Sequence, residues 1–195
     1  MSSEKKESRL NSGLFVLLLG PSGVGKSTII KELAKELDIT YVTPVMDRPL
    51  RPGETEKTSL APKEFTKKEE AGEFLVINHL YGSRYGTPRQ AVEQTLSARR
   101  IAVLDFPLSK LAELSQYKER GVLLTIYILP PSHEELARRL TLDNRDPQGI
   151  RLAEGLAELT SLEQSNLSHP DINFFIVNEE ASITAQQIKQ LILSD

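Results

Sequence analysis

Residues 14–28 read LFVLLLGPSGVGKST, an apolar run followed by a glycine-rich loop and the first residues of a helical pattern. The apolar run is typical of a parallel strand that is covered on both faces. The loop from Gly20 to Ser27 fits the pattern G-x-x-x-x-G-K-[ST]. Its glycines allow backbone N–H groups to turn inward around phosphate oxygens, and the dipole of the following helix favours the same negative charge. The stretch therefore predicts a phosphate-binding loop in an α/β protein.

The loop also carries the two side chains that nucleotide chemistry needs. Lys26 would reach the β- and γ-phosphates of ATP, and the Ser27 hydroxyl would hold Mg²⁺. The alternative is a glycine-rich turn that merely looks like such a loop, but a strand before it and a helix after it are the context that the motif requires. ATP and Mg²⁺ are the expected cofactors. The residues expected to bind the nucleotide are Gly20, Pro21, Ser22, Gly23, Val24, Gly25, Lys26, Ser27 and Thr28.

Short apolar runs alternate with helical patterns along the rest of the chain. Between the runs, apolar residues recur at helical spacing, as in Ile29, Ile30, Leu33 and Leu37. This alternation predicts an α/β fold, with a P-loop core whose five-stranded parallel sheet is flanked by helices. The expected strands are Leu14–Leu19, Ile39–Thr43, Ile101–Asp105, Val122–Leu129 and Ile172–Val177.

Composition narrows the range of functions. The chain has 195 residues, a net charge of -3 and no cysteine, which excludes a disulfide scaffold, a thiolate zinc site and a cysteine nucleophile. Proteins that bind duplex nucleic acid usually have strongly basic domains, so we expect no nucleic-acid partner. Residues 1–12 are expected to be a disordered polar tail without a secretory signal, and no apolar run is long enough to span a bilayer. The sequence therefore favours a cytoplasmic protein with no membrane partner.

Two segments interrupt the alternation of strands and helices. Residues 44–87 are rich in Pro, Gly, Lys, Arg and Glu, with a helical pattern at Pro62–Glu70, and residues 141–150 form a short polar loop between two helices. Inserted segments on a rigid core often carry binding function. We therefore divide the chain into a P-loop core of residues 13–43 and 88–195, an insertion of residues 44–87, and a lid of residues 141–150 within the core.

Four further motifs follow the glycine-rich loop along the chain. They are Arg48-Pro-Leu-Arg51-Pro-Gly-Glu54, Gly72-Glu-Phe-Leu75, Tyr81-Gly-Ser-Arg-Tyr85-Gly-Thr87 and Val103-Leu-Asp105. In their order and spacing they resemble the motifs of guanylate kinases. The resemblance covers nearly the whole chain from Gly13 and implies a P-loop kinase core, an acceptor-binding insertion at 44–87 and a lid at 141–150. Together these would transfer a phosphoryl group from ATP to a monophosphate, a small-molecule acceptor.

The resemblance assigns the acceptor phosphate to Arg48, Arg51 and Tyr85. Arginine suits this role because its planar guanidinium can bind a phosphate through two hydrogen bonds. Glu54 follows the arginines and Thr87 matches a residue that contacts the base, so both are expected to bind the acceptor. The alternative for the two arginines is a solvated pair on the surface.

Asp105 follows the apolar run Ile101–Leu104, which is the pattern of a Walker-B acid at the end of a strand. There its carboxylate would orient Mg²⁺ and face the substrate. The alternative is an N-cap for a helix that starts near Pro107. Ser27 and Asp105 are the expected metal-binding residues.

In the family, arginines of the lid close over the ATP phosphates and stabilise the transferring group. The resemblance implies this role for Arg139, Arg145 and Arg151, and the alternative is that each lies on an exposed helix face. The lysine of the loop and the first acceptor arginine are also expected to act in catalysis. The expected catalytic residues are therefore Lys26, Arg48, Arg139, Arg145 and Arg151.

The positions that read the base in guanylate kinases do not match. Where the family has a Glu that accepts hydrogen bonds from guanine, this chain has Val76. A Ser of the family falls on Pro44, and an Asp falls on Pro107. Phosphate-binding residues remain while base-binding residues are lost, so we expect catalysis to be kept and the choice of acceptor to be altered.

Two alternatives to a nucleoside monophosphate kinase stay open. Ribose 1,5-bisphosphate phosphokinases resemble guanylate kinases and also lack the Glu, and His79 matches a His of theirs. A sugar phosphate is thus a second candidate acceptor, with His79 either bonded to a sugar hydroxyl or simply on the surface. The other alternative is a non-catalytic protein-binding module, against which the intact Lys26-Ser27 argues. The sequence is compatible with a monomer and with a homodimer.

Overall fold

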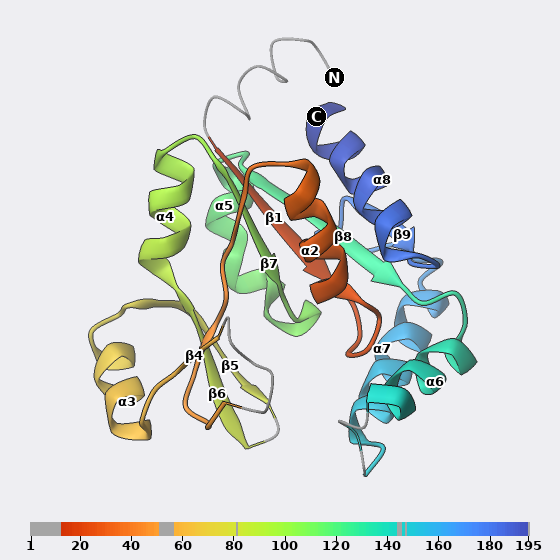
Figure 1. Ribbon diagram of the computed structural model, residues 1–195, viewed down its shortest axis with the longest axis horizontal. Coiled ribbons are helices and arrows are strands. Elements are labelled where there is room, and N and C mark those ends of the chain that lie inside the picture. Colours follow the sequence, from red (N-terminus) through yellow and green to blue (C-terminus); the bar gives the residue numbers. More distant parts are fainter. Residues whose placement is uncertain (1–12, 51–56, 81, 144–145, 147, 195) are drawn as a thin grey trace.

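The computed structural model describes residues 13–50, 57–80, 82–143, 146 and 148–194, which form two sheets with flanking helices (Figure 1). The strands of the larger sheet are β1 (Leu14–Leu19), β2 (Ile39–Tyr41), β7 (Ile101–Asp105), β8 (Leu123–Leu129) and β9 (Phe174–Val177). They are all parallel, in the order β2-β7-β1-β8-β9. This sheet confirms the predicted α/β fold with a five-stranded parallel P-loop core.

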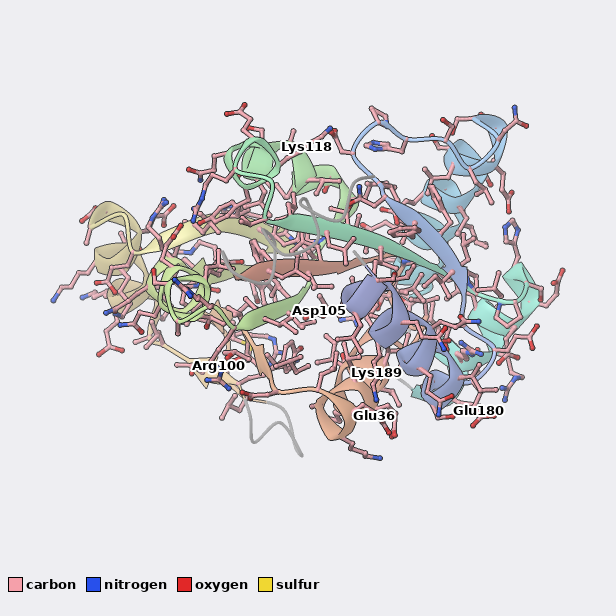
Figure 2. All side chains as sticks on the ribbon, turned by 90° about the horizontal axis from the view of Figure 1, so that it is seen from above. Glu36, Arg100, Asp105, Lys118, Glu180 and Lys189 are labelled. Atoms are coloured by element: carbon pink, nitrogen blue, oxygen red, sulfur yellow. The ribbon has the colours of Figure 1, made fainter. Side chains whose placement is uncertain are left out.

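Helices cover both faces of this sheet, which explains why its strands are continuous apolar runs. Every residue of β1 is buried, as expected for the central strand of a doubly covered sheet. On one face lie α2 (Lys26–Glu36) and α8 (Ala181–Ser194), and on the other lie η1 (Leu108–Leu114) and α5 (Ser115–Glu119) (Figure 2). The remaining helices of the larger sheet are α4 (Arg89–Ser97), α6 (His133–Asp143) and α7 (Ile150–Gln164).

Strand β9 begins two residues later than the sequence predicts, at Phe174. The reason is Asn173, whose side-chain Oδ1 accepts hydrogen bonds from the Thr125 backbone N–H at 2.8 Å and from its hydroxyl at 2.8 Å. The backbone N–H of Asn173 in turn donates to the Thr125 hydroxyl oxygen at 3.0 Å. These side-chain bonds accompany a backbone bond from the Asn173 N–H to the Thr125 carbonyl oxygen at 3.0 Å, and regular pairing starts one residue further on.

The smaller sheet comes from residues 45–88. Its strands are β3 (Val45–Met46), β4 (Thr58–Ser59), β5 (Phe74–Leu80) and β6 (Ser83–Pro88), in the order β4-β3-β6-β5. Helix α3 (Pro62–Glu70), at the position that the sequence predicts, packs on this sheet through Phe65. The Phe65 ring is fully buried and stacks on the ring of Phe74, with 4.6 Å between the centroids. The small sheet therefore has an aromatic core of its own.

Two side chains cap the helices on either side of residues 144–149. The Ser132 hydroxyl accepts a hydrogen bond from the backbone N–H of Glu135 at 3.1 Å and so caps α6. The Asp146 carboxylate accepts from the backbone N–H groups of Arg151 and Leu152 at 3.0 and 2.9 Å, at the start of α7. No helix among the described residues has the length and apolar character that crossing a membrane requires.

Candidate functional site

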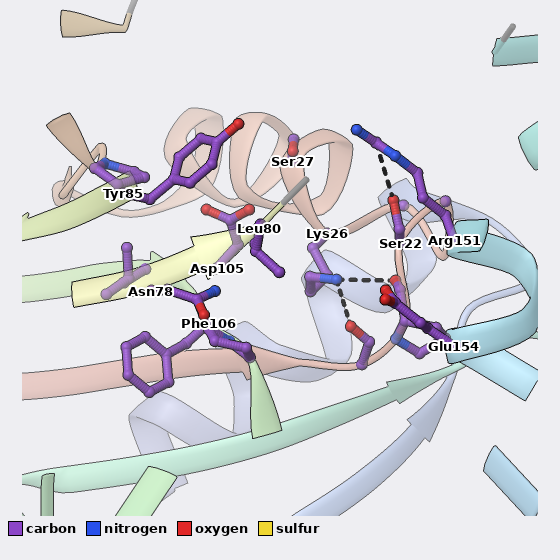
Figure 3. Close-up of a pocket in the computed structure, with 18 of the residues that line it drawn as sticks. Ser22, Lys26, Ser27, Asn78, Leu80, Tyr85, Asp105, Phe106, Arg151 and Glu154 are labelled. Atoms are coloured by element: carbon purple, nitrogen blue, oxygen red, sulfur yellow. Dashed lines mark hydrogen bonds between the residues drawn. The ribbon is translucent and has the colours of Figure 1, made fainter. Parts of the chain in front are cut away.

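A cleft of about 900 Å³ opens between the carboxyl ends of the parallel strands and the smaller sheet. The carboxyl ends of such a sheet are where α/β proteins bind ligands. Figure 3 shows Tyr85 and Asn78 on one side of this cleft and Lys26, Ser22 and Arg151 on the other. The loop half of the cleft is lined by residues that include Gly20, Lys26, Arg139, Arg151 and Asn178. The sheet half is lined by residues that include Arg48, Val76, Asn78, Tyr85 and Thr87.

The glycine-rich loop owes its shape to close contact between backbones. Gly20 has a φ of 125°, and a Cβ at this position would lie 2.4 Å from the carbonyl oxygen of Ile128 in β8. Gly25 has a φ of 106°, and a Cβ there would lie 2.5 Å from the side-chain nitrogen of Asn178. Any larger residue at these two positions would clash and would also be strained. The residues from Gly20 to Thr28 line the cleft, apart from Val24, whose side chain is buried in the core.

Lys26 lies at the centre of the loop half, at the start of α2. Its Nζ donates hydrogen bonds to the carbonyl oxygens of Gly20 at 2.6 Å and Pro21 at 2.9 Å. Burial lowers the pKa of the Lys26 ammonium, and the negative charges of Asp105 and Glu158 partly oppose this effect. The ammonium is therefore held in the mouth of the loop, where the loop's glycines would present their N–H groups to a phosphate.

Asn178, directly after β9, braces the loop from the far edge of the sheet. Its Nδ2 donates to the carbonyl oxygen of Val24 at 2.8 Å, and its Oδ1 accepts from the hydroxyl of Thr184 at 2.9 Å. Only 3% of Asn178 is exposed, and a buried amide needs such partners to offset its desolvation. No local pattern marks this residue in the sequence, because its partner Val24 lies 154 positions earlier.

Arg139 on α6 connects the same elements through its guanidinium. Nε donates to Glu135 Oε1 at 2.7 Å, Nη1 to the carbonyl oxygen of Val24 at 3.2 Å, and Nη2 to that of Asn178 at 3.0 Å. The structure thus places Arg139 in the cleft wall, bound to backbone carbonyls. Arg151 on α7 lies closer to the loop, with Nη1 3.5 Å from the hydroxyl of Ser22 (Figure 3).

Asp105 ends β7 and points into the middle of the cleft (Figure 3). Its Oδ1 accepts a hydrogen bond from the hydroxyl of Tyr41 in β2 at 3.0 Å. The N-cap position of the following helix η1 is Pro107, with no side-chain capping bond. The alternative role of Asp105 as a helix cap is therefore not what the structure shows.

Arg48 and Tyr85 form a pair in the sheet half. Arg48 Nε donates to the hydroxyl oxygen of Tyr85 at 2.8 Å, and the guanidinium carbon lies 5.8 Å from the centre of the tyrosine ring. Arg48 Nη1 also donates to the carbonyl oxygen of Pro49 at 2.7 Å. These bonds orient a planar cation and a hydroxyl together, a combination that suits a phosphate group.

Comparison with known proteins agrees with this geometry. The family model described as guanylate kinase matches residues 12–195. The chain belongs to the guanylate kinase family. It is 31% identical to a guanylate kinase of Novosphingobium aromaticivorans over 188 residues, covering 94% of this chain and 82% of the relative. It is 33% identical to one from Corynebacterium diphtheriae over 190 residues, covering 93% of this chain and 95% of the relative.

The fold agrees as well. The crystal structure of guanylate kinase from Anaplasma phagocytophilum superposes with a TM-score of 0.70 at 24% identity, covering 94% of this chain and 86% of that one. At this level of identity the match speaks for the fold alone. The family model and the relatives carry the assignment, which makes this chain a guanylate kinase-like P-loop kinase and confirms the class that its motifs predict.

The residues by which this chain differs from the guanylate kinase pattern all line the cleft. Val76 is 3% exposed and presents an apolar wall, and Pro44 and Pro107 are further lining residues. Thr87, 5% exposed, lies among the lining residues, and so does His79, which is exposed.

Three of the predicted site residues lie outside the described residues. They are Arg51, Glu54 and Arg145, and their predicted roles stay predictions.

Two residues that line the cleft were not predicted from the sequence, namely Tyr41 and Glu158. Glu158 accepts a hydrogen bond from the hydroxyl of Tyr127 at 2.6 Å, and burial together with this carboxylate raises the pKa of Tyr127. Glu158 could have been suspected from its spacing, since it lies two helical turns after Arg151 on α7.

Proposed function

We propose that this protein transfers the γ-phosphate of ATP to the phosphate of GMP, with weak discrimination among acceptor bases. One observation carries the proposal: the cleft brings the lysine-bearing glycine loop and the Arg48–Tyr85 pair to face each other across Asp105. An anion site on each side would hold two phosphate groups that repel each other in water, and positive charge between them offsets that repulsion. The curated relatives, which are named guanylate kinases, support GMP as the acceptor.

The loop half would hold ATP. Backbone N–H groups of the loop and the Lys26 ammonium would bind the phosphates, the ammonium exchanging its two carbonyl partners for phosphate oxygens. Mg²⁺ would neutralise charge on the phosphates, and its ligands would be the Ser27 hydroxyl and, through water, the Asp105 carboxylate. The described residues offer no group of three or more acidic, histidine or cysteine side chains for a metal. A magnesium ion bound by few protein ligands fits this donor set, because Mg²⁺ usually keeps its waters and substrate phosphates.

The sheet half would hold the acceptor. Arg48 and Tyr85 would bind its phosphate, joined by Arg51 and Glu54 from the same motif, while Thr87 and His79 would contact the body of the acceptor. We assign residues 44–87 as the acceptor-binding insertion of a core made of residues 13–43 and 88–195. Residues 141–150 are assigned as the lid. Of the arginines in and around it, Arg151 is supported by its distance to Ser22, and Arg139 by its place in the cleft wall.

The reaction needs no side chain to act as a strong base. An oxygen of the acceptor phosphate, already ionised at neutral pH, forms the new bond to the γ-phosphorus as the bond from that phosphorus to the leaving ADP oxygen breaks. Lys26 and the arginines would stabilise the charge that spreads over the transferring group. We assign this reaction to the cytoplasm, because ATP and small nucleotides are found there.

A sugar phosphate is the second candidate acceptor, favoured by a specific feature of the sheet half. The described lining residues from the insertion include no carboxylate, and Asp105 in the middle of the cleft already accepts a bond from Tyr41. Guanine presents N–H donors, which a carboxylate would recognise best. A sugar hydroxyl could instead bond to Asn78 or His79, which line the same wall.

The test measures ADP release with ATP and Mg²⁺ over a panel of GMP, dGMP, AMP, CMP, UMP and ribose 1,5-bisphosphate. We expect turnover with GMP, and a decrease in kcat/KM of about 10²–10³-fold in Lys26→Met. Lys35→Met is the matched control, because Lys35 lies on the same helix but is 66% exposed and pairs with Glu32 on the surface. Undiminished transfer in Lys26→Met would overturn the mechanism, and turnover with ribose 1,5-bisphosphate alone would replace GMP by the second candidate.

A further inference from the structure

Two other side chains stand directly beside the Arg48–Tyr85 pair. Asp47 and Arg84 are its sequence neighbours, one on each of the two paired segments. The backbone N–H of Arg84 donates to Asp47 Oδ1 at 2.7 Å, and that of Asp47 donates to the carbonyl oxygen of Arg84 at 3.2 Å. Because successive side chains of a strand point to opposite faces, Arg84 and Tyr85 of β6 project from opposite faces of the small sheet. Arg48 and Tyr85 line the cleft, whereas Arg84 packs on α3.

Arg84 joins three elements of the smaller sheet through its guanidinium. Nε donates to Asp47 Oδ2 at 2.7 Å, and Nη1 donates to Glu69 Oε2 at 2.8 Å and to the Thr66 hydroxyl at 3.1 Å. Nη2 donates to the carbonyl oxygen of Pro62 at 3.1 Å. The guanidinium also lies 4.5 Å from the centre of the buried Phe65 ring. Helix α3 is thereby fastened to the two segments that carry the phosphate pair.

The Asp47–Arg84 ion pair is more shielded from solvent than the ion pair between Lys68 and Glu73 of the same insertion. The side chains of Arg84 and Asp47 are 20% and 13% exposed, whereas those of Lys68 and Glu73 are 41% and 51% exposed. Burial alone would raise the pKa of Asp47, but the hydrogen bonds and charge of Arg84 outweigh it and hold that pKa below its usual value. A shielded pair with several hydrogen bonds restricts geometry far more than an exposed one.

We propose that Asp47 and Arg84 are positioning residues for the acceptor phosphate. They fix the two backbone positions from which Arg48 and Tyr85 reach into the cleft, and so set the separation of the cation and the hydroxyl. The inference rests on the proposed function, because it takes the Arg48–Tyr85 pair to be the acceptor-phosphate site. It assigns to the Asp47–Arg84 pair an effect on acceptor binding and none on ATP binding, since the loop half is held by separate contacts.

The first experiment compares Asp47→Asn with wild type in the ADP-release assay. The amide keeps the size of the side chain, but its NH₂ group meets the Nε–H donor of Arg84 and the ion pair is lost. We expect the KM for GMP to increase about tenfold or more, because small misplacements of a binding group carry large kinetic costs. The KM for ATP should stay unchanged. Glu73→Gln is the matched control, because it removes an exposed ion pair of the same insertion and should alter neither constant.

A double-mutant cycle separates positioning from general stabilisation. Tyr85→Phe removes the hydroxyl that orients Arg48, so Asp47→Asn should raise the KM for GMP much less in the Tyr85→Phe background than in wild type. If Asp47→Asn raised the KM for GMP by the same factor in wild type and in Tyr85→Phe, the proposal would be overturned. So would an increase of both KM values together with a lower melting temperature, which is the result expected of a merely structural role.

A calorimetric measurement of GMP affinity in the absence of ATP tests this inference separately from the proposed function. A wild-type protein that binds GMP but transfers no phosphate contradicts the proposed reaction, and the expected tenfold loss of GMP affinity in Asp47→Asn still supports the positioning role. Equal GMP affinity of wild type and Asp47→Asn, or no GMP binding by wild type, contradicts the positioning role.

Discussion

The two halves of the cleft are built in different ways. In the loop half, the glycine backbone lies against the carbonyl of Ile128 and against Asn178, and the strand that leads into the loop, β1, is fully buried. In the sheet half, the binding groups are side chains on a small sheet with a core of its own around Phe65. The loop half thus depends on the conformation of the main chain, whereas the sheet half depends on the identity of its side chains.

The difference shows which properties of this kinase can change independently. A loop whose backbone contacts a neighbouring strand tolerates little variation, because any added atom meets another backbone that cannot move. The side chains that line the sheet half are not held by such backbone contacts. The sequence accordingly keeps the phosphate-binding pattern of the loop, whereas Val76, Pro44 and Pro107 depart from the guanylate kinase pattern.

The largest expected effect comes from breaking the backbone contact of the loop half. Gly20→Ala places a Cβ 2.4 Å from the Ile128 carbonyl oxygen at a φ of 125°, so we expect the free energy of unfolding to fall by about 3 kcal/mol and ATP affinity to be lost. Gly72→Ala is the control, with a φ of 69° but open space around the new methyl group; its cost should be about 1 kcal/mol. Urea denaturation measures both, and similar losses in the two variants would contradict the contact argument.

The second expectation sharpens the contrast by restoring a base-reading group in the sheet half. Val76→Glu places a carboxylate in the cleft wall, where it could accept hydrogen bonds from guanine. The ratio of kcat/KM for GMP over AMP should rise by about ten- to a hundredfold, as one charged hydrogen bond allows. This ratio does not depend on the fraction of folded enzyme, so a loss of stability from the buried position leaves it valid. Val76→Gln should raise the ratio less, and an unchanged ratio in Val76→Glu would mean that the base lies elsewhere.

The smallest effect concerns a charged contact at the outer wall of the loop half. Hydrogen bonds from Arg138, and then from Arg139, lower the pKa of Glu135 from 4.5 to about 2. Because the folded value is the lower one, the ionised carboxylate stabilises the folded protein above about pH 4.5, and this contribution disappears as the pH falls towards 2. Wild type should thus exceed Glu135→Gln in unfolding free energy at pH 6, and the gap should narrow at pH 3. Urea titrations at both pH values test this, and a constant gap would contradict it.

The larger sheet could be predicted because its signals are local, whereas the smaller sheet lies in a segment for which the sequence predicted one helix and no strands. Continuous apolar runs such as Leu14–Leu19 correspond to doubly covered strands, and Pro62–Glu70 forms the helix that its pattern indicates. The glycine loop was recognisable for the same reason, since the eight residues from Gly20 to Ser27 carry the whole pattern. The cleft-lining positions of Arg48, Tyr85 and Asp105 followed from motif order.

What escaped prediction depends on partners that are distant in sequence. The bond from Tyr41 to Asp105 joins residues 64 positions apart, and the Asp47–Arg84 ion pair joins residues 37 apart. Neither residue type nor spacing marks such pairs in a single sequence. Arg139 is an intermediate case: its bond to Glu135 follows from their i, i+4 spacing, but its bonds to the carbonyls of Val24 and Asn178 do not.

The brace from Asn178 to Val24 also bears on how the protein becomes active during its synthesis. The ribosome makes the phosphate loop early, but the amide that holds Val24 is added 154 residues later, and the threonine that orients this amide follows it on α8. Until that segment has left the exit tunnel, the loop lacks its support from β9. A growing chain should therefore bind ATP poorly, and nucleotide affinity should appear abruptly once α8 has emerged and packed.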